Sequence, residues 1–307
     1  MFQTLHGIPG YEEMNQIWST LYLGSYEATQ NLPELQKHNI RTILTVMHTE
    51  IPADKRHPTV KYHYIPAHDI ESQDLLTRFP EAYAIIDAAV TAKTGILVHC
   101  AAGISRSATT VISYLMKKLG KTATAAHDLC QRKRTIIGPN DSFLIQLRLY
   151  EKMGCRLDAN HLPFRQYLFN ICDHFDNYAQ FFERLAVAER STSYLNLGQK
   201  FGCVGCGQEL FRELHVLHND GSQRYQELPE CGKVFVEPQR WMSGQFAAYD
   251  RALSVVVIKC PKCDRPVAKF YTPTGTEVTP IGCLCRNHLD TKNLDIQMLP
   301  DAYKLLS

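Results

Sequence analysis

The chain of 307 residues lacks three features that define large classes of proteins. It has no apolar run approaching the roughly 20 residues that cross a bilayer. Its opening residues, MFQTLHGIPGYEE, have no secretory signal profile. It has no excess of charge, because 33 basic and 31 acidic residues give a formal net charge of +2. These absences argue against membrane insertion, secretion and electrostatic binding of nucleic acid, so we expect a soluble intracellular protein.

Disulfides are also not expected, although the chain has 11 cysteines. Four of the cysteines are scattered, at positions 100, 130, 155 and 172, and the other seven lie within residues 203–285. Such crowding in an intracellular chain is typical of metal ligands. The length and a hydrophobic content of 45% allow two domains, each with its own core.

The most informative segment is HCAAGISR, residues 99–106. The apolar residues 95–98 before it predict a short buried strand, and residues 107–119 after it predict a helix. A tight loop of small residues between a strand and a helix N-terminus is typical of a phosphate-binding site, because backbone N–H groups and the helix dipole attract the anion.

Each loop residue has an expected role in cleaving a phosphate monoester. The phosphate-binding groups are the backbone N–H groups of Ala101, Ala102, Gly103, Ile104, Ser105 and Arg106. The Arg106 side chain adds a planar fork for two oxygens. We expect the Cys100 thiolate to attack phosphorus and form a phosphocysteine without any metal. Ser107 then donates a hydrogen bond to the departing thiolate, and His99 completes the catalytic set.

The reaction needs an acid to protonate the leaving oxygen. Asp69 lies in the loop after the strand-like residues 60–65 and is the favoured candidate. Asp74 is the alternative, and its structural interpretation is an N-terminal cap for the helical pattern of residues 75–90, which Pro80 interrupts.

This set resembles the signature of cysteine-dependent protein phosphatases, because His99, Gly103, Ser105 and Ser107 also match it. The placement of Asp69 resembles the dual-specificity pattern, in which the aspartate is the general acid. The resemblance covers about residues 15–155. It implies a shallow site that admits phosphoserine and phosphothreonine as well as phosphotyrosine. In the segment that opens the last helix of this domain, Asn140 either braces the phosphate loop or, like Asp141, caps that helix.

The cysteine-rich region predicts two structural zinc sites. Cys260 and Cys263 form a CxxC pair, and together with Cys283 and Cys285 they make a complete four-thiolate site around a predicted hairpin. The second site has Cys203, Cys206 and Cys231 as ligands and needs a histidine. His218 is favoured over His215 and His288. Two alternatives are compatible with the sequence: the two sites exchange ligands, or only one zinc ion binds. With every position filled by protein, no zinc catalysis is expected.

Between the domains, apolar and aromatic residues recur at helical spacing. This pattern predicts a helical connector that packs against one or both domains. A coiled-coil dimer is the less favoured alternative. The residues of the pattern are Phe164, Tyr167, Leu168, Ile171, Phe175, Tyr178, Phe182 and Leu185. The predicted organisation is therefore a phosphatase domain over residues 1–158, a connector over 159–200 and a zinc-binding domain over 201–307. The fold class is α/β, a central sheet flanked by helices, followed by a small β-rich, zinc-ribbon-like domain.

The C-terminal half resembles that of the YVH family, the zinc-binding dual-specificity phosphatases associated with assembly of the large ribosomal subunit. The resemblance includes the first CxxC with residues 207–212, the segment CGKVFVEPQRW from Cys231 to Trp241, and the second CxxC with the CxC. It implies either an enzyme whose zinc domain recruits phosphoprotein substrates, or an assembly factor that acts mainly through its zinc domain. Both imply a protein of the cytoplasm and nucleus.

The partner of the zinc domain is expected to be a protein surface of the large-subunit precursor or its assembly factors. Residues 201–307 contain 12 basic and 12 acidic side chains, so no strong generic binding of nucleic acid is predicted. Trp241, Phe211 and Tyr225 are expected in the core of the domain rather than stacked on bases.

Overall fold

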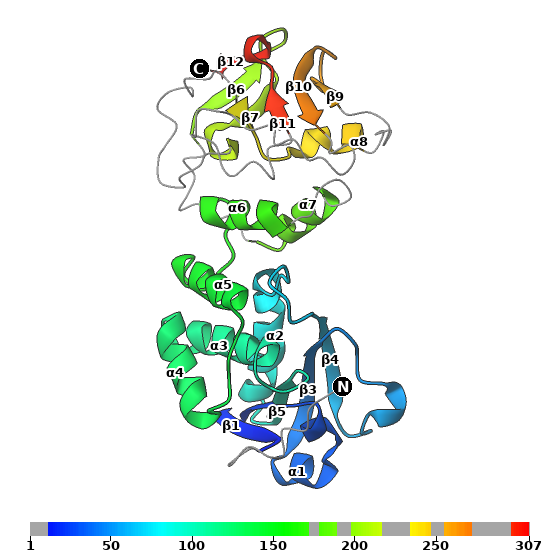
Figure 1. Ribbon diagram of the computed structural model, residues 1–307, viewed down its shortest axis with the longest axis vertical. Helices are drawn as coiled ribbons and strands as arrows, with labels where there is room; N and C mark the ends of the chain where they lie inside the picture. Colours follow the sequence, from blue (N-terminus) through cyan, green and yellow to red (C-terminus); the bar gives the residue numbers. More distant parts are fainter. Residues whose placement is uncertain are drawn as a thin grey trace. The chain divides into compact units, whose positions relative to one another are not determined.

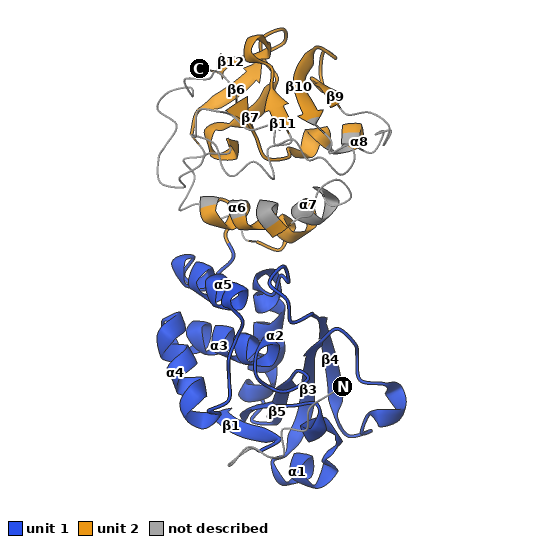
Figure 2. Ribbon diagram, in the orientation of Figure 1, with its two compact units in different colours: residues 1–157 blue, residues 158–307 orange. Residues whose placement is uncertain are grey.

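The computed structural model describes residues 12–171, 178–188, 198–216, 234–246, 255–271 and 296–306. The chain divides into two compact units, residues 1–157 and 158–307 (Figure 2). The boundary lies one residue before the predicted end of the phosphatase domain, and the helical connector belongs to the second unit.

The first unit is built on a five-stranded sheet in the order β1-β2-β5-β3-β4 (Figure 1). The strands are β1 (Met14–Trp18), β2 (Leu21–Gly24), β3 (Ile40–Met47), β4 (Lys61–Pro66) and β5 (Gly95–His99). Four of them run parallel, and the edge strand β1 pairs antiparallel with β2. Strand β5 is central and every residue in it is buried, as expected of a parallel strand that is covered on both faces.

Helices cover both faces of this sheet. They are α1 (Leu32–Lys37), α2 (Phe79–Thr91), α3 (Arg106–Leu119), α4 (Ala123–Lys133) and α5 (Asp141–Lys152). Helices α2 to α5 lie on one side and α1 on the other (Figure 1). Helix α3 packs against α2, α4 and α5, and its first 11 residues are buried, so the segment that follows the phosphate loop is fixed on all sides. No helix in the described ranges is long and apolar enough to cross a membrane.

One expectation for this unit is corrected. The helical pattern of residues 75–90 is a short 3-10 turn, Leu76–Arg78, followed by α2. Pro80 therefore begins the helix instead of interrupting it, because in the first turn its missing N–H has no intrahelical partner to lose.

The second unit is β-rich. Its strands are β6 (Lys200–Cys203), β7 (Glu209–Arg212), β8 (Val234–Phe235), β9 (Val255–Lys259), β10 (Pro266–Tyr271), β11 (Ile296–Met298) and β12 (Tyr303–Leu306). They form two antiparallel sheets, ordered β12-β6-β7 and β8-β11-β10-β9. Residues from both sheets share one core that includes Phe211, Ile258 and Phe270. Helix α8 (Ser243–Phe246) lies between β8 and β9 in the sequence.

The predicted connector contains two described helices, α6 (Leu162–Ile171) and α7 (Tyr178–Ala186). The residues between them, including Phe175, lie outside the described part, so the expectation of one long helix is not tested there. Phe164 and Leu168 on α6 are fully buried, in line with packing of the aromatic face.

A buried ion pair holds α6 to the β-rich part of the second unit. The Arg165 guanidinium donates to the Glu237 carboxylate through Nε, at 2.9 and 3.0 Å, and through Nη2. Its Nη1 donates to the Ala159 carbonyl at 2.6 Å. Burial raises the pKa of Glu237, while Arg165 opposes that rise. This ion pair attaches the connector helix to the β-rich part of the second unit. Removing either side chain would leave the charge of the other buried and unpaired.

Candidate active site and metal centre

The phosphate loop follows β5 directly and leads into α3. Cys100 is 1% exposed and begins the loop, and Arg106 is the first residue of the helix. The Ser107 hydroxyl donates to the Cys100 thiol sulfur at 3.1 Å. The structure therefore brings together the predicted nucleophile, the predicted arginine and the serine that was expected to bind the departing thiolate.

The carbonyls of the loop are anchored one after another by groups outside it. Ala101 O accepts from Tyr26 N at 3.0 Å, and Ile104 O accepts from Gly138 N at 2.9 Å. Between them, Ala102 O and Gly103 O accept from the Arg134 side chain at 3.1 and 2.9 Å.

This anchoring fixes the direction of the loop N–H groups. In a planar trans peptide, the carbonyl of one residue and the N–H of the next point in opposite directions. Anchoring the carbonyls of residues 101–104 outward therefore turns the N–H groups of residues 102–105 toward the interior of the loop. Four preorganised donors and a helix N-terminus facing one small space are suited to a phosphate anion.

Gly103 is required by the geometry of this loop. Its φ is +70°, and a Cβ there would lie 2.5 Å from the backbone carbonyl group of Gly24. Any side chain would push the loop away from β2, so glycine is the residue that allows the turn.

His99 supports the loop from the end of β5 and is fully buried. Its Nδ1 lies 3.1 Å from the Cys100 carbonyl, and its Nε2 lies 2.8 Å from the Thr45 hydroxyl. Because a carbonyl can only accept, Nδ1 carries the proton, and the neutral ring accepts from Thr45 through Nε2. Burial, with a smaller contribution from nearby Arg106, lowers the pKa of His99 to about 4, although the bond to the Cys100 carbonyl opposes the shift. The ring is thus a neutral support and not an acid or base of the reaction.

Asp69 lies at the mouth of the loop, as predicted. One carboxylate oxygen accepts from the Ser105 hydroxyl at 2.8 Å and from the Asn140 side-chain amide at 3.0 Å. The other lies 3.5 Å from Arg106 Nε. The Asp69 side chain is 36% exposed, so a substrate oxygen can reach it.

The Arg106 guanidinium is almost completely buried and points into the same space. Its Nη1 donates to the Ala67 carbonyl at 3.2 Å. Its Nε has no hydrogen-bond partner among the described residues. A buried cationic donor of this kind is available to a phosphate oxygen.

Asp74, the alternative acid, has a structural role. Its carboxylate is 6% exposed and accepts from the backbone N–H of Thr77 at 3.1 Å and from the Thr77 hydroxyl. It caps the turn that leads into α2, which is the structural interpretation that the sequence offered. The geometry therefore favours Asp69.

Asn140 combines the two roles that the sequence left open. Its side-chain oxygen caps α5 by accepting from Phe143 N at 3.0 Å, while its amide donates to Asp69. Its backbone N–H donates to the Ser105 hydroxyl at 3.3 Å.

Sequence reasoning missed several supports of the site. Tyr26 and Arg134 anchor loop carbonyls, and the buried Gln146 accepts from the backbone N–H groups of Leu75 and Leu76, both at 2.9 Å. These residues are distant in sequence from the loop or lie in ordinary helical patterns, so a single sequence carries no signal for them.

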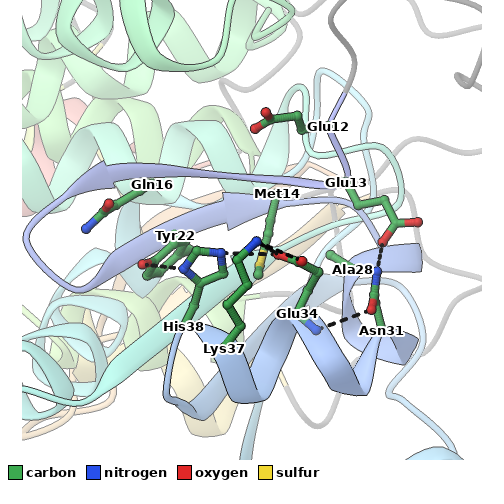
Figure 3. A pocket seen from close by; sticks show the side chains of 10 residues that line it. All are labelled: Glu12, Glu13, Met14, Gln16, Tyr22, Ala28, Asn31, Glu34, Lys37 and His38. Atoms are coloured by element: carbon green, nitrogen blue, oxygen red, sulfur yellow. Dashed lines mark hydrogen bonds and ion pairs between the residues drawn. The ribbon is translucent and has the colours of Figure 1, made fainter.

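A separate pocket of about 520 Å³ lies beside α1 and β1 (Figure 3). Six of the polar side chains that line it form three pairs. Tyr22 bonds to His38 at 3.1 Å, Lys37 donates to Glu34 at 2.9 Å, and Asn31 donates to Glu13 at 3.0 Å. It contains no nucleophile and is distinct from the phosphate loop.

The metal centre is formed by two similar hairpin turns. The first CxxC lies in the turn between β6 and β7, and the second in the turn between β9 and β10. In the first turn, Cys203 N donates to Gln208 O and Gly207 N donates to Cys203 O, both at 2.8 Å. In the second, Cys260 N donates to Arg265 O at 2.8 Å and Asp264 N donates to Cys260 O at 3.1 Å.

The four thiols of these turns meet at one point. The sulfurs of Cys203, Cys206, Cys260 and Cys263 all lie within 4.8 Å of one another. Two of the separations, Cys203 to Cys263 and Cys206 to Cys260, are 3.6 Å. Tetrahedral zinc with Zn–S bonds of about 2.3 Å requires sulfurs about 3.8 Å apart. The four thiols fit a zinc ion.

The expected pairing of Cys260 and Cys263 with Cys283 and Cys285 is therefore wrong. The two CxxC pairs combine with each other, which is the exchanged arrangement left open by the sequence. The reason is topological, because each CxxC ends the first strand of a hairpin and the two hairpins share one core.

The thiols of the cluster differ in their electrostatics when no cation is bound. Burial raises the pKa of the Cys260 thiol. At Cys263 a backbone hydrogen bond from Arg265 lowers the pKa, but burial and the neighbouring thiols outweigh it and raise the pKa to about 12. Burial raises the pKa of the Cys203 thiol, but hydrogen bonds from the backbone N–H groups of Cys206 and Gly205 and from neighbouring thiols outweigh it and hold the pKa at about 7. Thiolates are the form that binds zinc.

The remaining predicted ligands, Cys231, His218, Cys283 and Cys285, and the alternative His288 lie outside the described residues. His215 is described, and its Nδ1 accepts from Arg212 N at 3.1 Å. Burial, together with Arg165 and Arg212, lowers its pKa to about 3. It is not part of the described thiol cluster. Phe211 is 1% exposed and belongs to the core, as expected, while Tyr225 lies outside the described residues.

Comparison with known proteins agrees with this site. The family model "Dual specificity phosphatase, catalytic domain" matches residues 21–153. The human dual specificity protein phosphatase 9 is 42% identical over 146 residues, which cover 48% of this chain and 38% of that protein. The tyrosine-protein phosphatase yvh1 of Schizosaccharomyces pombe is 27% identical over 270 residues, 87% of this chain and 79% of that protein. The solved Yvh1 phosphatase domain of Chaetomium thermophilum is 30% identical over 46% of this chain and 97% of its own, with a TM-score of 0.42.

The fold, the loop and the family model together define the first unit as the catalytic domain of a cysteine-dependent dual-specificity phosphatase. The similarity to yvh1 extends through most of the chain, and the second unit is β-rich with a four-cysteine cluster. Along most of its length the chain is therefore similar to a dual-specificity phosphatase of the YVH type.

The His99 geometry predicts a specific dependence of stability on pH. The pKa of His99 is about 4 in the folded protein and about 6.5 when unfolded, so the unfolded state binds one more proton between these values. The free energy of unfolding should therefore fall by about 1.4 kcal/mol per pH unit from this residue as the pH drops from 6.5 to 4. Urea unfolding at a series of pH values measures this slope. In His99→Gln the free energy of unfolding should change less steeply with pH, by the equivalent of one proton, whereas His48→Gln, at an exposed position, should keep the wild-type slope. Equal slopes in all three proteins would contradict the assignment.

The metal centre predicts the effect of removing one thiol. Cys206→Ser should lower the bound zinc by one ion per chain and should lower the melting temperature of the second unit, because zinc binding is coupled to folding. Zinc content by atomic emission and unfolding by calorimetry measure the two effects. Cys155→Ser, at a half-buried cysteine outside the cluster, serves as the control. Full zinc content in Cys206→Ser would rule out this ligand set.

Proposed function

We propose that the protein hydrolyses phosphotyrosine and phosphoserine or phosphothreonine in protein substrates through a phosphocysteine intermediate. The observation that carries this proposal is the loop itself, where Cys100 begins a ring of N–H donors whose directions are fixed by four anchored carbonyls. The proposed site needs no metal, because every group of the reaction is supplied by the chain.

The first step transfers the phosphoryl group. The Cys100 thiolate forms a bond to phosphorus as the bond from phosphorus to the substrate oxygen breaks. Asp69 gives its proton to that oxygen, so the product leaves as an alcohol or phenol. Arg106 and the loop N–H groups bind the three remaining oxygens, which share the negative charge of the phosphoryl group in the transition state.

The second step releases phosphate. Asp69, now ionised, accepts a proton from a water molecule, and the water oxygen attacks phosphorus. The bond from phosphorus to sulfur breaks, and the thiolate of Cys100 is stabilised by the Ser107 hydroxyl at 3.1 Å. The enzyme returns to its initial state with Asp69 protonated.

The zinc-binding unit is proposed to hold two structural zinc ions. The cluster of Cys203, Cys206, Cys260 and Cys263 holds the first. The remaining predicted ligands, Cys231, His218, Cys283 and Cys285, supply the second. Bound zinc contributes folding energy, and the chain fills all positions, so zinc takes no part in the phosphatase reaction.

A second function rests on the independence of the second unit. Its own core and its four-cysteine cluster support a role as a docking module. From the family resemblance, we propose that it binds a protein surface of the large ribosomal subunit precursor or its assembly factors, in the cytoplasm and nucleus. In this alternative the phosphatase activity is secondary.

The assignment of Asp69 predicts a dependence on the leaving group. Asp69→Asn should lower kcat for phosphotyrosine peptides by about 10²- to 10⁴-fold, because the leaving oxygen needs a proton. For aryl phosphates whose leaving group is a strong acid, the loss in kcat/KM, which reports the first step, should be much smaller. Steady-state kinetics over such a series measure the effect, with the exposed Asp54→Asn as control. A loss that is the same for all leaving groups would contradict the role of general acid, and full activity of Cys100→Ser would refute the proposed function.

The two functions separate in cells. Cells lacking the protein are given either Cys100→Ser or a chain truncated near residue 195, and the level of large ribosomal subunits is measured. Rescue by Cys100→Ser alone would show that docking is essential and catalysis secondary. Rescue by the truncated chain alone would show that the enzyme is essential, and would refute the docking function.

A further inference from the structure

We infer that Arg134 is a positioning residue that sets the anion affinity of the phosphate loop by fixing two of its peptide planes. This inference rests on the proposed phosphatase function and adds a residue to it. Arg134 directly follows α4, is 31 residues after Gly103, and is 2% exposed.

The guanidinium of Arg134 bridges the loop and the edge of the sheet. Its Nε donates to Gly103 O at 2.9 Å and its Nη2 to Ala102 O at 3.1 Å. On the other side, its Nη1 donates to Glu12 O at 2.8 Å and to the side-chain oxygen of Asn15 at 2.7 Å. Four donors of one planar group therefore have partners, so the fork has no freedom to rotate.

Arg134 fixes the two peptide planes of the loop whose carbonyls accept no described hydrogen bond from a backbone N–H group. Ala101 O and Ile104 O accept from backbone N–H groups, which any residue supplies. For Ala102 O and Gly103 O the described hydrogen bonds come from the Arg134 side chain. The N–H groups that these planes direct inward belong to Gly103 and Ile104, in the middle of the loop.

The middle of the loop is also where the backbone is least restrained by its own residues. Gly103 has no Cβ and adopts a φ of +70°, a region from which glycine moves at little cost. Without the fork, the planes on either side of Gly103 can rotate and turn their N–H groups away from the phosphate. The hydrogen bonds from Arg134 therefore restrict the rotation of these planes, which glycine alone does not restrict.

Charge alone does not account for this arrangement. A lysine ammonium is a compact charge without a planar fork, so it cannot hold two adjacent carbonyls and two further acceptors at once. Arg134→Lys therefore keeps the positive charge beside the loop but loses the planar set of hydrogen bonds to the loop carbonyls. This variant separates the effect of the charge from the effect of the hydrogen bonds.

The test compares Arg134→Lys and Arg134→Met with the wild type and with Arg132→Met, a matched change at an exposed position two residues earlier in α4. The probe is orthovanadate, measured as a competitive inhibitor, together with kcat, KM and the thermal midpoint. Both Arg134 variants should bind vanadate about 10- to 100-fold more weakly, since hydrogen bonds that organise a charged site are lost. Arg132→Met should stay within about twofold.

Arg134→Lys keeps the inference falsifiable if Arg134→Met does not fold. A folded Arg134→Lys with wild-type vanadate affinity would overturn the inference, as would a loss of kcat at unchanged vanadate affinity. Asn15→Ala removes one contact of Nη1 but none to the loop, and it should bind vanadate within about twofold of the wild type. A wild-type protein that neither turns over substrate nor binds vanadate would refute the proposed function itself.

Discussion

The outward anchoring of the phosphate-loop carbonyls is the constraint on which the first unit depends. A peptide plane has one donor and one acceptor on opposite sides, so a loop can present N–H groups to an anion only if its carbonyls are satisfied elsewhere. Here the satisfying groups come from two separate segments, one at Tyr26 and one in the connection between α4 and α5 that contains Arg134 and Gly138. The sheet order and the helices α4 and α5 serve to bring those segments to the end of β5. The arrangement also explains why Asn140 and Ser105 contact Asp69, because the segment that anchors the loop continues into the residues that hold the acid.

In the second unit, the corresponding constraint is the meeting of two CxxC hairpins around a small core. Two hairpins end in CxxC turns with matching backbone hydrogen bonds, and the thiols meet where the hairpins share their core. Residues Gly207 and Asp264 occupy equivalent positions in the two turns and both have positive φ, +71° and +56°. A zinc ion held by these thiols would therefore join the two sheets in the way that a larger apolar interface does in a larger domain. The buried pair of Arg165 and Glu237 attaches the connector helix to this unit.

The sequence predicted the features that depend on local order along the chain. The strand, loop and helix around Cys100 and the approach of Asp69 to the loop follow from patterns of apolar residues and from one motif. The sequence did not predict the contacts between distant segments. Arg134 and Gln146 resemble ordinary helical residues, and the sequence does not show that Pro80 lies in the first turn of α2, where proline is tolerated. The thiol pairing failed for the same reason, since ligand spacing shows which cysteines can share a metal but not which hairpins meet.

The measurement that tests the central claim most directly is mass spectrometry of the protein quenched during turnover of a phosphotyrosine peptide. With an aryl phosphate whose leaving group is a strong acid, Asp69→Asn slows the second step more than the first, so this variant should then increase the trapped species. The account predicts a single phosphate on the peptide that contains Cys100, absent in Cys100→Ser. Steady turnover with no phosphate on Cys100, or with phosphate on another residue, would contradict it.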